Sequence, residues 1–399
     1  MSGAGGHERL VVVGAGAAGS RALRALVTQK YPGELHLVSA EQDGPYYRPG
    51  LSKQLLSGSQ DLAQLRRALA VDPVVHRHDS AAVGLDLEAR LVRLEDGTEL
   101  AFDRLLIASG SVPRTLPGIQ VGGRIGSVDG PAKVARFRDW LAGAGEGAEV
   151  LVVGAGLIGS EVASTLNAAG ADVVVVDPST TPLARALGSY VDTLSRDWHA
   201  EHGVRVELGR LVASLSQDED GVEAILDDGQ VLRAGFAVLA IGVRPATDWL
   251  LGSGLPLTAA GGVEVDETLL VGGRPDIAAA GDVADWPSAR LGRRARVEHW
   301  AVAIEQGAAA AYNLTHDDPQ PFDTVPMFWT EQHGRLVHFV GHREPDSDWV
   351  DVTEGELPRE GRVVAAVSDG VETGYLLIQA PQLLRRYQQQ AAQWSRVLS

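Results

Sequence analysis

Two stretches of the chain repeat one pattern: a run of apolar residues, then three glycines, then a segment with helical periodicity. Leu10 to Ser20 reads LVVVGAGAAGS, and Leu151 to Ser160 reads LVVGAGLIGS. An unbroken apolar run predicts a strand buried on both faces of a parallel sheet. Glycines at this spacing predict a tight turn from the strand into a helix. The repeat therefore predicts two units of the same βαβ design.

The segments that follow each glycine turn also correspond. After the first turn, the pattern predicts a helix at 21–29, a strand at 34–39, short strands with an Asp-Gly hairpin turn between 82 and 103, and a strand at 105–110. After the second turn, it predicts a strand at 171–177, a hairpin at 222–232 and a strand at 237–242. The remaining predicted elements are helices at 51–56, 132–141, 296–314 and 381–398 and a strand at 328–332.

Composition narrows the class of protein. With 399 residues, 45% of them hydrophobic, the chain can bury the cores of two or three domains. The formal net charge of −17 argues against nucleic acid or an anionic membrane as a partner, because both attract basic surfaces. No stretch reaches the roughly 18 apolar residues of a membrane span, and the first residues do not read as a secretory signal. We therefore expect a cytoplasmic protein.

The chain contains no cysteine. This excludes disulfides, thiolate metal ligands, iron–sulfur ligation and a Cys-x-x-Cys redox relay together. We expect no metal site.

The glycine turns carry the first candidate chemistry. Each opens a helix whose N-terminal amides can face a pyrophosphate. A single turn of this kind is also explained by tight packing alone, but two copies favour two nucleotide sites in one chain. The candidate residues are Gly14, Gly16, Ala17, Ala18 and Gly19 in the first turn and Gly154, Gly156, Leu157, Ile158 and Gly159 in the second.

An acid follows each turn at the distance where such units place a ribose ligand. Glu41 lies 22 residues after Gly19, and Asp177 lies 18 residues after Gly159. For Glu41 the alternative is a solvated acid at the end of a strand. An acid at the second position hydrogen-bonds the ribose of NAD and repels the 2′-phosphate of NADP, so we expect a preference for NADH. Arg185, the nearest following arginine, contacts either a phosphate of that nucleotide or solvent.

Small residues end one strand of each unit. The strand at 105–110 ends in Ala108, Ser109 and Gly110, and the strand at 237–242 ends in Gly242. Small residues at this place let a flat ligand approach the backbone, although strand packing explains the same letters.

Two further segments hold charged candidates. Gly281 and Asp282 either bring a carboxylate to a sugar-like chain or form a simple turn. The loop at 45–56, PYYRPGLSKQLL, carries Arg48 and Lys53, which are either ligand contacts or surface charges.

Taken in order, the two glycine turns and the segments PYYRPGLSK, IASG, AIGVRP, AAGDVAD, RVEHW and PMFW resemble the FAD-dependent pyridine nucleotide oxidoreductases over nearly the whole chain. Within that family the chain is similar to the cysteine-free NADH:ferredoxin reductases of cytochrome P450 and ring-hydroxylating dioxygenase systems. The resemblance implies an α/β fold with two Rossmann-like three-layer nucleotide-binding domains, as in glutathione reductase, and a smaller α+β C-terminal interface domain. It implies an FAD-binding domain of residues 1–115 and 246–318, an NAD-binding domain of 116–245 and an interface domain of 319–399.

The resemblance also implies roles for the candidate residues. The first glycine turn and Glu41 would bind the adenosine half of FAD, and Asp282 its ribityl chain. The second turn and Asp177 would hold NADH. The residues near the flavin would be Arg48, Lys53, Trp300 and Trp329. Two departures from the family pattern are Gly50, where a second proline is usual, and Ser109, where threonine is usual.

The implied cofactors set the expected chemistry. A nicotinamide delivers a hydride to the flavin, and the flavin releases electrons singly, which a nicotinamide cannot do. The resemblance pairs Glu161, two residues after Gly159, with Lys53 beside the flavin, where a cation favours the negative charge of the reduced ring. The alternative for Glu161 is an acid that only complements the helix N-terminus.

Without cysteine, the electron acceptor must be external. Our leading hypothesis is a small, acidic iron–sulfur ferredoxin that docks on basic side chains, although arginine-rich loops are often merely solvated. Those side chains are Arg290, Arg293, Arg294 and Arg296, with Arg385 and Arg386 as further candidates. Enzymes of the same fold that reduce rubredoxin, a quinone or dioxygen are alternatives, as is an NADH-sensing flavoprotein that works by binding a partner. The sequence leaves open whether the protein is a monomer or a dimer.

Overall fold

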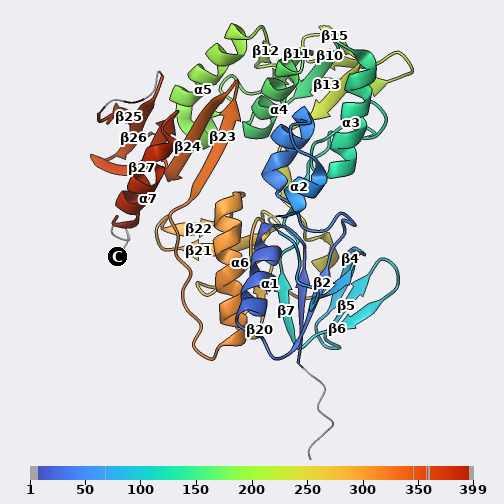
Figure 1. The fold of residues 1–399 in the computed structure, drawn as a ribbon, viewed down its shortest axis with the longest axis vertical. Coiled ribbons are helices and arrows are strands. Elements are labelled where there is room, and N and C mark those ends of the chain that lie inside the picture. Colours follow the sequence, from blue (N-terminus) through green and yellow to red (C-terminus); the bar gives the residue numbers. More distant parts are fainter. Residues whose placement is uncertain (1–7, 68, 345, 356, 358–359, 395–399) are drawn as a thin grey trace, which may run out of the picture.

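The computed structural model describes residues 8–67, 69–344, 346–355, 357 and 360–394. Three large sheets organise this part of the chain. In Figure 1 the first sheet lies in the lower half, the second at the top, and the third at the upper left.

The first sheet has six strands in the order β19-β20-β7-β1-β2-β3. They are β1 (Arg9–Val13), β2 (Glu34–Val38), β3 (His76–His78), β7 (Arg104–Ile107), β19 (Leu270–Val271) and β20 (Arg274–Ala279). All neighbouring strands are parallel except β19 and β20. Because β19 and β20 follow the second unit in the sequence, this sheet joins segments from both sides of that unit.

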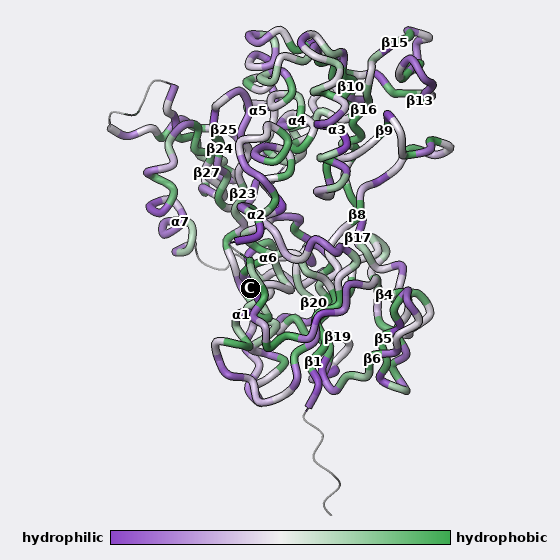
Figure 2. The backbone as a smooth tube through the Cα atoms, turned by 45° about the vertical axis from the view of Figure 1, so that its right-hand side comes forward, coloured by the Kyte–Doolittle hydropathy of each residue, from purple (hydrophilic) through white to green (hydrophobic). Residues whose placement is uncertain are grey.

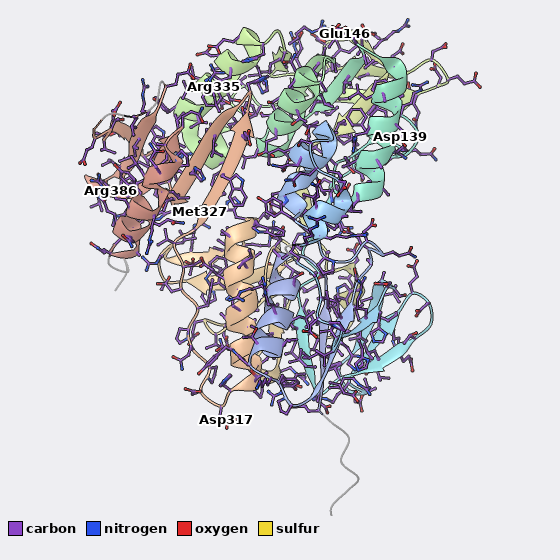
Figure 3. The ribbon with its side chains drawn as sticks, in the orientation of Figure 1. Asp139, Glu146, Asp317, Met327, Arg335 and Arg386 are labelled. Atoms are coloured by element: carbon purple, nitrogen blue, oxygen red, sulfur yellow. The ribbon has the colours of Figure 1, made fainter. Side chains whose placement is uncertain are left out.

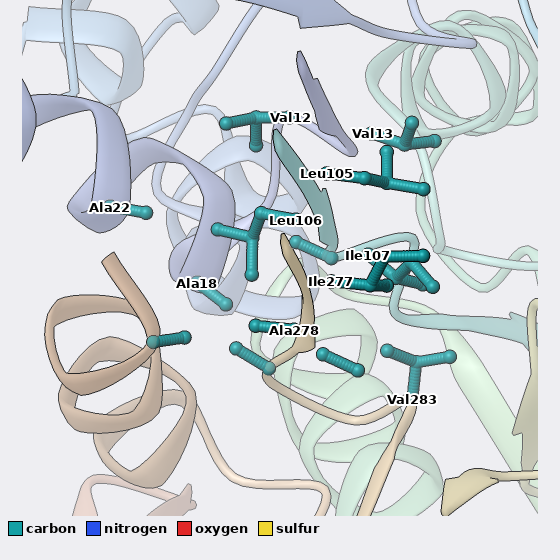
Figure 4. Packing of buried hydrophobic residues seen from close by; sticks show 14 of the residues in the cluster. Val12, Val13, Ala18, Ala22, Leu105, Leu106, Ile107, Ile277, Ala278 and Val283 are labelled. Carbon is teal, nitrogen blue, oxygen red and sulfur yellow. The ribbon is translucent and has the colours of Figure 1, made fainter. Parts of the chain in front are cut away.

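Helices α1 (Ala17–Thr28) and α6 (Trp300–Thr315) pack together against the first sheet. Ala18 and Ala22 of α1 lie beside the buried strand residues Leu106 and Ala278 (Figure 4). The two helices approach closely because Gly307 has no side chain: a Cβ there would lie 2.2 Å from the carbonyl oxygen of Ala18. This packing covers the helix that follows the first glycine turn.

The second sheet has five parallel strands in the order β12-β11-β10-β16-β9. They are β9 (Ile125–Gly126), β10 (Glu149–Val153), β11 (Asp172–Asp177), β12 (Arg205–Leu208) and β16 (Phe236–Leu239). The helices of this unit are α3 (Pro131–Ala144), α4 (Leu157–Ala168) and α5 (Ala184–Glu201), which is kinked at Gly188.

Two short strands connect the two units. β8 (Ser111–Pro113) leaves the first unit and pairs antiparallel with β17 (Val243–Pro245), which leaves the second. Figure 2 shows the two strands side by side between the units. Both crossings of the chain therefore occur at one place.

The third sheet is antiparallel, with strands in the order β23-β24-β27-β26-β25. They are β23 (Met327–Gln332), β24 (Arg335–Gly341), β25 (Asp348–Asp351), β26 (Arg362–Ser368) and β27 (Val371–Ile378). One face packs on α5 through a cluster that includes Val191, Trp198 and Phe339. The other face packs on α7 (Leu384–Ala392) through Tyr375 and Tyr387. The third sheet is thus attached to the second unit by a hydrophobic core.

Small elements complete the described chain. The smaller strands are β4 (Ala82–Asp86), β5 (Leu91–Leu94), β6 (Glu99–Ala101), β13 (Val212–Gln217), β14 (Val222–Leu226), β15 (Val231–Ala234), β18 (Val263–Glu264), β21 (Ala284–Ser288) and β22 (Arg293–Ala295). The short helices are η1 (Arg48–Gly50), η2 (Leu51–Leu55), α2 (Leu62–Arg67), η3 (Asp248–Leu250) and η4 (Pro381–Leu383). Within the described residues, no helix is long and apolar enough to cross a membrane.

The predicted α/β class with two Rossmann-like units is confirmed, and the domain boundaries stay a prediction. The helix predicted at 296–314 begins later than expected: α6 starts at Trp300, and its N-cap His299 has an extended backbone (φ −127°, ψ 134°) and a ring that stacks on Phe328. The helix predicted at 381–398 is found as the short helix η4 (Pro381–Leu383) followed directly by α7 (Leu384–Ala392), and residues 395–398 of that prediction lie outside the described chain.

Candidate functional site

In the first glycine turn, two glycines are packed tightly against the backbone and one faces open space. Gly14 has φ +115°, and a Cβ there would lie 2.0 Å from the carbonyl oxygen of Ala108. A Cβ on Gly19 would lie 1.9 Å from the oxygen of Gly14. A Cβ on Gly16 would meet nothing within 4 Å. Packing therefore requires the first and third glycines, while the second faces open space that a ligand can enter.

The helix that follows the turn has no side-chain cap. Gly16 is the N-cap of α1, and no side chain accepts a hydrogen bond from its first amides. Such amides need acceptors, and the partial positive charge of a helix N-terminus favours an anion. Together with the space at Gly16, the turn fits the pyrophosphate of a dinucleotide.

The second turn has the same construction. Gly154 has φ +107°, with a Cβ position 2.3 Å from the oxygen of Ala240, and Gly159 would place a Cβ 1.9 Å from the oxygen of Gly154. Gly156 again faces open space. In the first helical turn, Leu157 is half-buried and Ile158 is 51% exposed. The second turn therefore also fits a pyrophosphate.

Asp177 ends β11 beside the second turn. Its carboxylate accepts hydrogen bonds from the backbone N–H groups of Ala155 at 2.7 Å and Ser179 at 2.8 Å. The backbone thus fixes this acid at the mouth of the turn, where a ribose ligand is expected. The side chain of Arg185 lies outside the described part of the chain.

Glu41, the acid of the first unit, is held by side chains of the loop at 45–56. It forms an ion pair with Arg48 and accepts a hydrogen bond from the hydroxyl of Tyr46 at 2.6 Å. Arg48 also donates to the carbonyl of Asp129 at 2.6 Å. Arg48 therefore lies against the acid expected at the ribose, although the sequence predicted it near the flavin.

Small residues join the strand ends to the connection between the units. Gly110 has φ +70° and Gly242 has φ +90°, both at the start of connecting strands. The hydroxyl of Ser109 donates to the carbonyl of Ala246 at 2.8 Å, and the Ala246 amide donates to Gly110 at 2.9 Å. Ser109 and Gly110 thus hydrogen-bond the end of the first unit to the chain that returns from the second.

Asp282 lies between the first glycine turn and the connecting strands. Its carboxylate accepts a hydrogen bond from Ser111 at 2.8 Å, and burial raises its pKa. The preceding Gly281 has φ +83° and donates its amide to the buried Gln306 at 2.8 Å. A partly desolvated carboxylate with few donors suits the hydroxyl groups of a polyol chain.

Lys53 and Glu161 meet at the junction of the two units. The Nζ of Lys53 lies 2.7 Å from Oε2 of Glu161, and their side chains are 13% and 4% exposed. The sequence predicted this contact, and the structure brings the two residues together over 108 positions. Their role beside a flavin stays a prediction.

Aromatic side chains gather next to this ion pair. Trp300, the first residue of α6, contacts Tyr47 edge-to-face at 5.3 Å between ring centroids. Burial raises the pKa of Tyr47, and the nearby charge of Glu161 adds to that effect. Trp329 lies on β23, and Figure 3 shows its neighbour Met327 where that strand comes beside α6.

Sequence reasoning missed three of these residues. Tyr47 belongs to the quoted loop PYYRPGLSK but received no role. Phe328 and His299 stack at 4.3 Å, and burial lowers the pKa of His299 to about 4. The aromatic residues in the segments around positions 47 and 299 could have indicated them.

The arginine-rich loop is mostly bonded within the fold. Arg290 pairs with Asp323 at 3.1 Å, Arg294 with Asp285 at 3.3 Å, and Arg296 with Glu298 at 2.5 Å. Arg293 is exposed and donates a 3.4 Å hydrogen bond to the carbonyl of Arg294. Arg385 is exposed and Arg386 pairs with Glu354 at 2.7 Å.

Among the residues that the structure describes, no group of three or more His, Asp or Glu side chains is arranged to hold a metal ion.

Comparisons with known proteins agree with this geometry. A family model described as pyridine nucleotide-disulphide oxidoreductase matches residues 8–307. Apoptosis-inducing factor 3 of Homo sapiens is 31% identical over 373 residues, 91% of this chain, and the chain spans 59% of that protein's length. The ferredoxin–NAD(+) reductase component of the biphenyl dioxygenase system of Paraburkholderia xenovorans is 33% identical over 344 residues, 84% of this chain and 82% of that protein.

A solved structure is similar over nearly the whole fold. The ferredoxin reductase for the CYP199A2 system from Rhodopseudomonas palustris is 28% identical, with a TM-score of 0.84 over 95% of this chain and 93% of that chain. The family model covers most of this chain, and both glycine turns have the geometry expected of nucleotide-binding units. The chain therefore belongs to the pyridine nucleotide-disulphide oxidoreductase family, although it has no cysteine to form the disulphide of the family name.

Proposed function

We propose that the protein is an FAD-dependent NADH:ferredoxin oxidoreductase of a cytochrome P450 or ring-hydroxylating dioxygenase system. The similarity to reductase components of such systems over 84% and 95% of this chain supports the proposal. FAD and NADH are the cofactors that the family and these relatives imply. The structural observation that carries the proposal is the buried pair of Lys53 and Glu161 between two nucleotide turns, in a chain without cysteine.

The cofactors supply the electron chemistry. When bound, FAD takes up the hydride of NADH and releases the two electrons one at a time, so that NADH and two oxidised ferredoxins become NAD⁺, H⁺ and two reduced ferredoxins. The absence of cysteine means that the chain itself stores no electrons in a disulfide.

The chain contributes binding and charge. In this proposal the first turn and Glu41 hold the adenosine half of FAD, and Asp282 holds the ribityl chain. The second turn and Asp177 hold NADH and disfavour NADPH. Lys53 places a cation near the flavin, with Trp300 and Trp329 at its sides. A positive charge there stabilises the negative charge that develops on the ring as it is reduced.

A ferredoxin is proposed to dock near β22. Three of the four arginines of this region are paired with acids, which leaves Arg293 as the main contributor. Arg385 is also exposed and is a further candidate. Reduction of ferredoxin should then slow as salt is raised, and a rate without salt dependence would contradict electrostatic docking. A cytoplasmic location, where NADH is produced, is part of the same proposal.

The test compares electron acceptors. The FAD-loaded protein is reduced with NADH under anaerobic conditions and mixed with a [2Fe–2S] ferredoxin, a rubredoxin, a quinone or dissolved dioxygen. We expect reoxidation by ferredoxin to be at least roughly tenfold faster than by the other acceptors. Faster reoxidation by another acceptor would replace ferredoxin in the proposal. Slow reoxidation by all of them would favour an NADH-sensing flavoprotein.

A further inference from the structure

Glu161 lies at a buried junction of three parts of the chain. Its Oε2 accepts hydrogen bonds from Ser52 Oγ and Lys53 Nζ, both at 2.7 Å, in the loop of the first unit. Its Oε1 accepts from Thr330 Oγ1 at 3.0 Å and from the Glu331 amide at 3.3 Å, both on β23 of the third sheet. A carboxylate has about four acceptor positions, so this one is fully satisfied.

Thr330 is well placed to fix this carboxylate. Its side chain is buried, with no exposed surface. The strand that carries it is anchored to the second unit just beyond, where the His333 amide donates to Ser164 at 2.6 Å and Ser195 donates to Gln332 at 2.6 Å. A hydroxyl on a strand held at several points has little freedom to follow a carboxylate that moves.

The two oxygens of Glu161 have different kinds of donor, with the charged one on Oε2 and only neutral ones on Oε1. Lys53 provides one positive charge and Glu161 one negative charge, and the other donors are neutral. Because neutral donors satisfy Oε1, the carboxylate of Glu161 attracts the ammonium of Lys53 less strongly than it would without them. Without the hydroxyl of Thr330, Oε1 would keep only the 3.3 Å amide of Glu331. Since an undersupplied buried carboxylate is costly, it would turn toward Lys53, its strongest donor.

We propose that Thr330 is a positioning residue for flavin reduction: by holding Oε1 of Glu161, it keeps the ammonium of Lys53 directed toward the flavin. This inference rests on the proposed function. It also gives the third sheet a second part in the chemistry besides Trp329, because Thr330 of that sheet sets the charge at the junction of the two nucleotide-binding units. The threonine stands in the segment PMFWTEQ, where only the tryptophan had been assigned a role.

The test uses four variants of the FAD-loaded protein. Thr330→Val removes the hydroxyl and keeps the shape, and Thr330→Ser keeps the hydroxyl. Thr324→Val is the matched control, because Thr324 is also buried and donates to a glutamate, Glu305, without touching Glu161. Should Thr330→Val not retain FAD, Thr330→Ala removes the hydroxyl with less bulk and is measured in its place.

Two quantities are measured. The rate of FAD reduction by NADH comes from anaerobic stopped-flow traces over a range of NADH concentrations. The midpoint potential of the bound FAD comes from titration with a chemical reductant. We expect Thr330→Val to slow reduction at saturating NADH roughly tenfold, with little change in the half-saturating NADH concentration, and to make the midpoint potential more negative. Thr330→Ser should return to within about twofold of wild type, and Thr324→Val should match wild type.

Three results would overturn the inference: a wild-type rate and potential in Thr330→Val, an equal loss in Thr330→Ser, or an equal loss in Thr324→Val. The second would show that any change in packing at this site causes the loss, with or without the hydroxyl, and the third would assign it to general loosening of the segment. If NADH fails to reduce even the wild-type protein, the proposed function is wrong. The potentials of the variants still decide the role of Thr330, because that titration does not use NADH.

Discussion

The two glycine turns have nearly the same internal hydrogen bonds and differ in the residues that surround them. In each, the first glycine donates its amide to the end of the neighbouring strand, Gly14 to Val38 and Gly154 to Val176, both at 2.8 Å. In each, a serine at the end of the motif donates to the second residue of the turn, at 3.1 Å and 3.2 Å. The turn is therefore one repeated device with the same demands on its backbone.

The surroundings of the two turns differ in enclosure. In the first, Ala17 and Ala18 are 9% and 4% exposed, and α6 and Gly281 pack directly over them. In the second, Ile158 at the corresponding place is 51% exposed. The acids differ too, since Glu41 is held by side chains of the loop at 45–56 and Asp177 by backbone amides. From this we infer that the enclosed turn retains FAD while the open turn exchanges NADH and NAD⁺.

Alanine at the first glycine of either turn is expected to have the largest effects. Gly14→Ala places a Cβ 2.0 Å from a carbonyl oxygen at a positive φ, at a cost of about 3 kcal/mol or more, so the purified protein should lose FAD. Gly154→Ala should retain FAD and lose roughly a hundredfold in its reduction rate by NADH. Flavin absorbance and anaerobic stopped flow measure the two effects.

The control for these variants is Gly229→Ala, at φ +86° with nothing within 4 Å, which carries the backbone strain without the clash. If Gly154→Ala lost FAD and Gly14→Ala kept it, the assignment of the two turns would be reversed.

Lys53→Met tests the group placed between the turns. Loss of the ammonium removes the charge that stabilises the reduced flavin, and we expect reduction by NADH to slow roughly a hundredfold with FAD still bound. Lys133→Met is the control, because Lys133 is exposed and its ion pair is with Asp129, four residues earlier in the sequence. An unchanged rate in Lys53→Met would remove Lys53 from the chemistry.

A histidine contact joins α5 of the second unit to the third sheet, whereas the histidine contact of the first unit, between His36 and His78, lies within one sheet. His199 of α5 lies 2.9 Å from His333 of the third sheet, and His202 stacks on His333 at 4.1 Å. Burial lowers the pKa of His199 to about 4 in the folded protein, against about 6.5 when unfolded. The folded state thus favours neutral His199, and its stabilising effect is complete above pH about 6.5 and is lost as the pH falls toward 4.

At pH 5 we expect this residue alone to cost about 2 kcal/mol of stability. His199→Gln should flatten the fall in unfolding temperature between pH 7.5 and pH 5, and His316→Gln, at an exposed helix end, should leave it unchanged. An equal slope in His199→Gln and wild type would show that another group is responsible.

Asp177→Ala tests why the second turn should prefer NADH to NADPH. Removing the carboxylate removes both the ribose ligand and the repulsion of a 2′-phosphate, so the preference for NADH over NADPH should fall roughly tenfold. Asp172→Ala, at the exposed start of the same strand, is the control. Steady-state kcat/KM for both nucleotides measures the preference, and an unchanged ratio would assign the discrimination elsewhere.

The features that the sequence predicted, the glycine turns and the buried strands, depend on local residue types. Gly14 and Gly154 are required by a positive φ and a close carbonyl, and both were recognisable from spacing alone. The buried strands β1 and β10 followed from unbroken apolar runs. Local backbone requirements of this kind can be recognised from the residues at the position itself, without knowing which distant residues they contact.

The sequence could not predict contacts between distant segments. Thr330 meets Glu161 across 169 positions, and Tyr47 meets Trp300 through the packing of a loop on a helix. The arginines of the loop before α6 read as a docking surface, but their acidic partners include Asp323 and Asp285, which only the fold brings near. Charge in a sequence shows neither exposure nor pairing.

An anaerobic titration of the purified, dialysed protein with NADH, followed by flavin absorbance, tests whether the protein binds FAD and takes electrons from NADH. We expect a yellow protein that keeps one FAD per chain through dialysis and is bleached by about one equivalent of NADH. A colourless protein with no flavin absorbance, even after FAD is added, would contradict it.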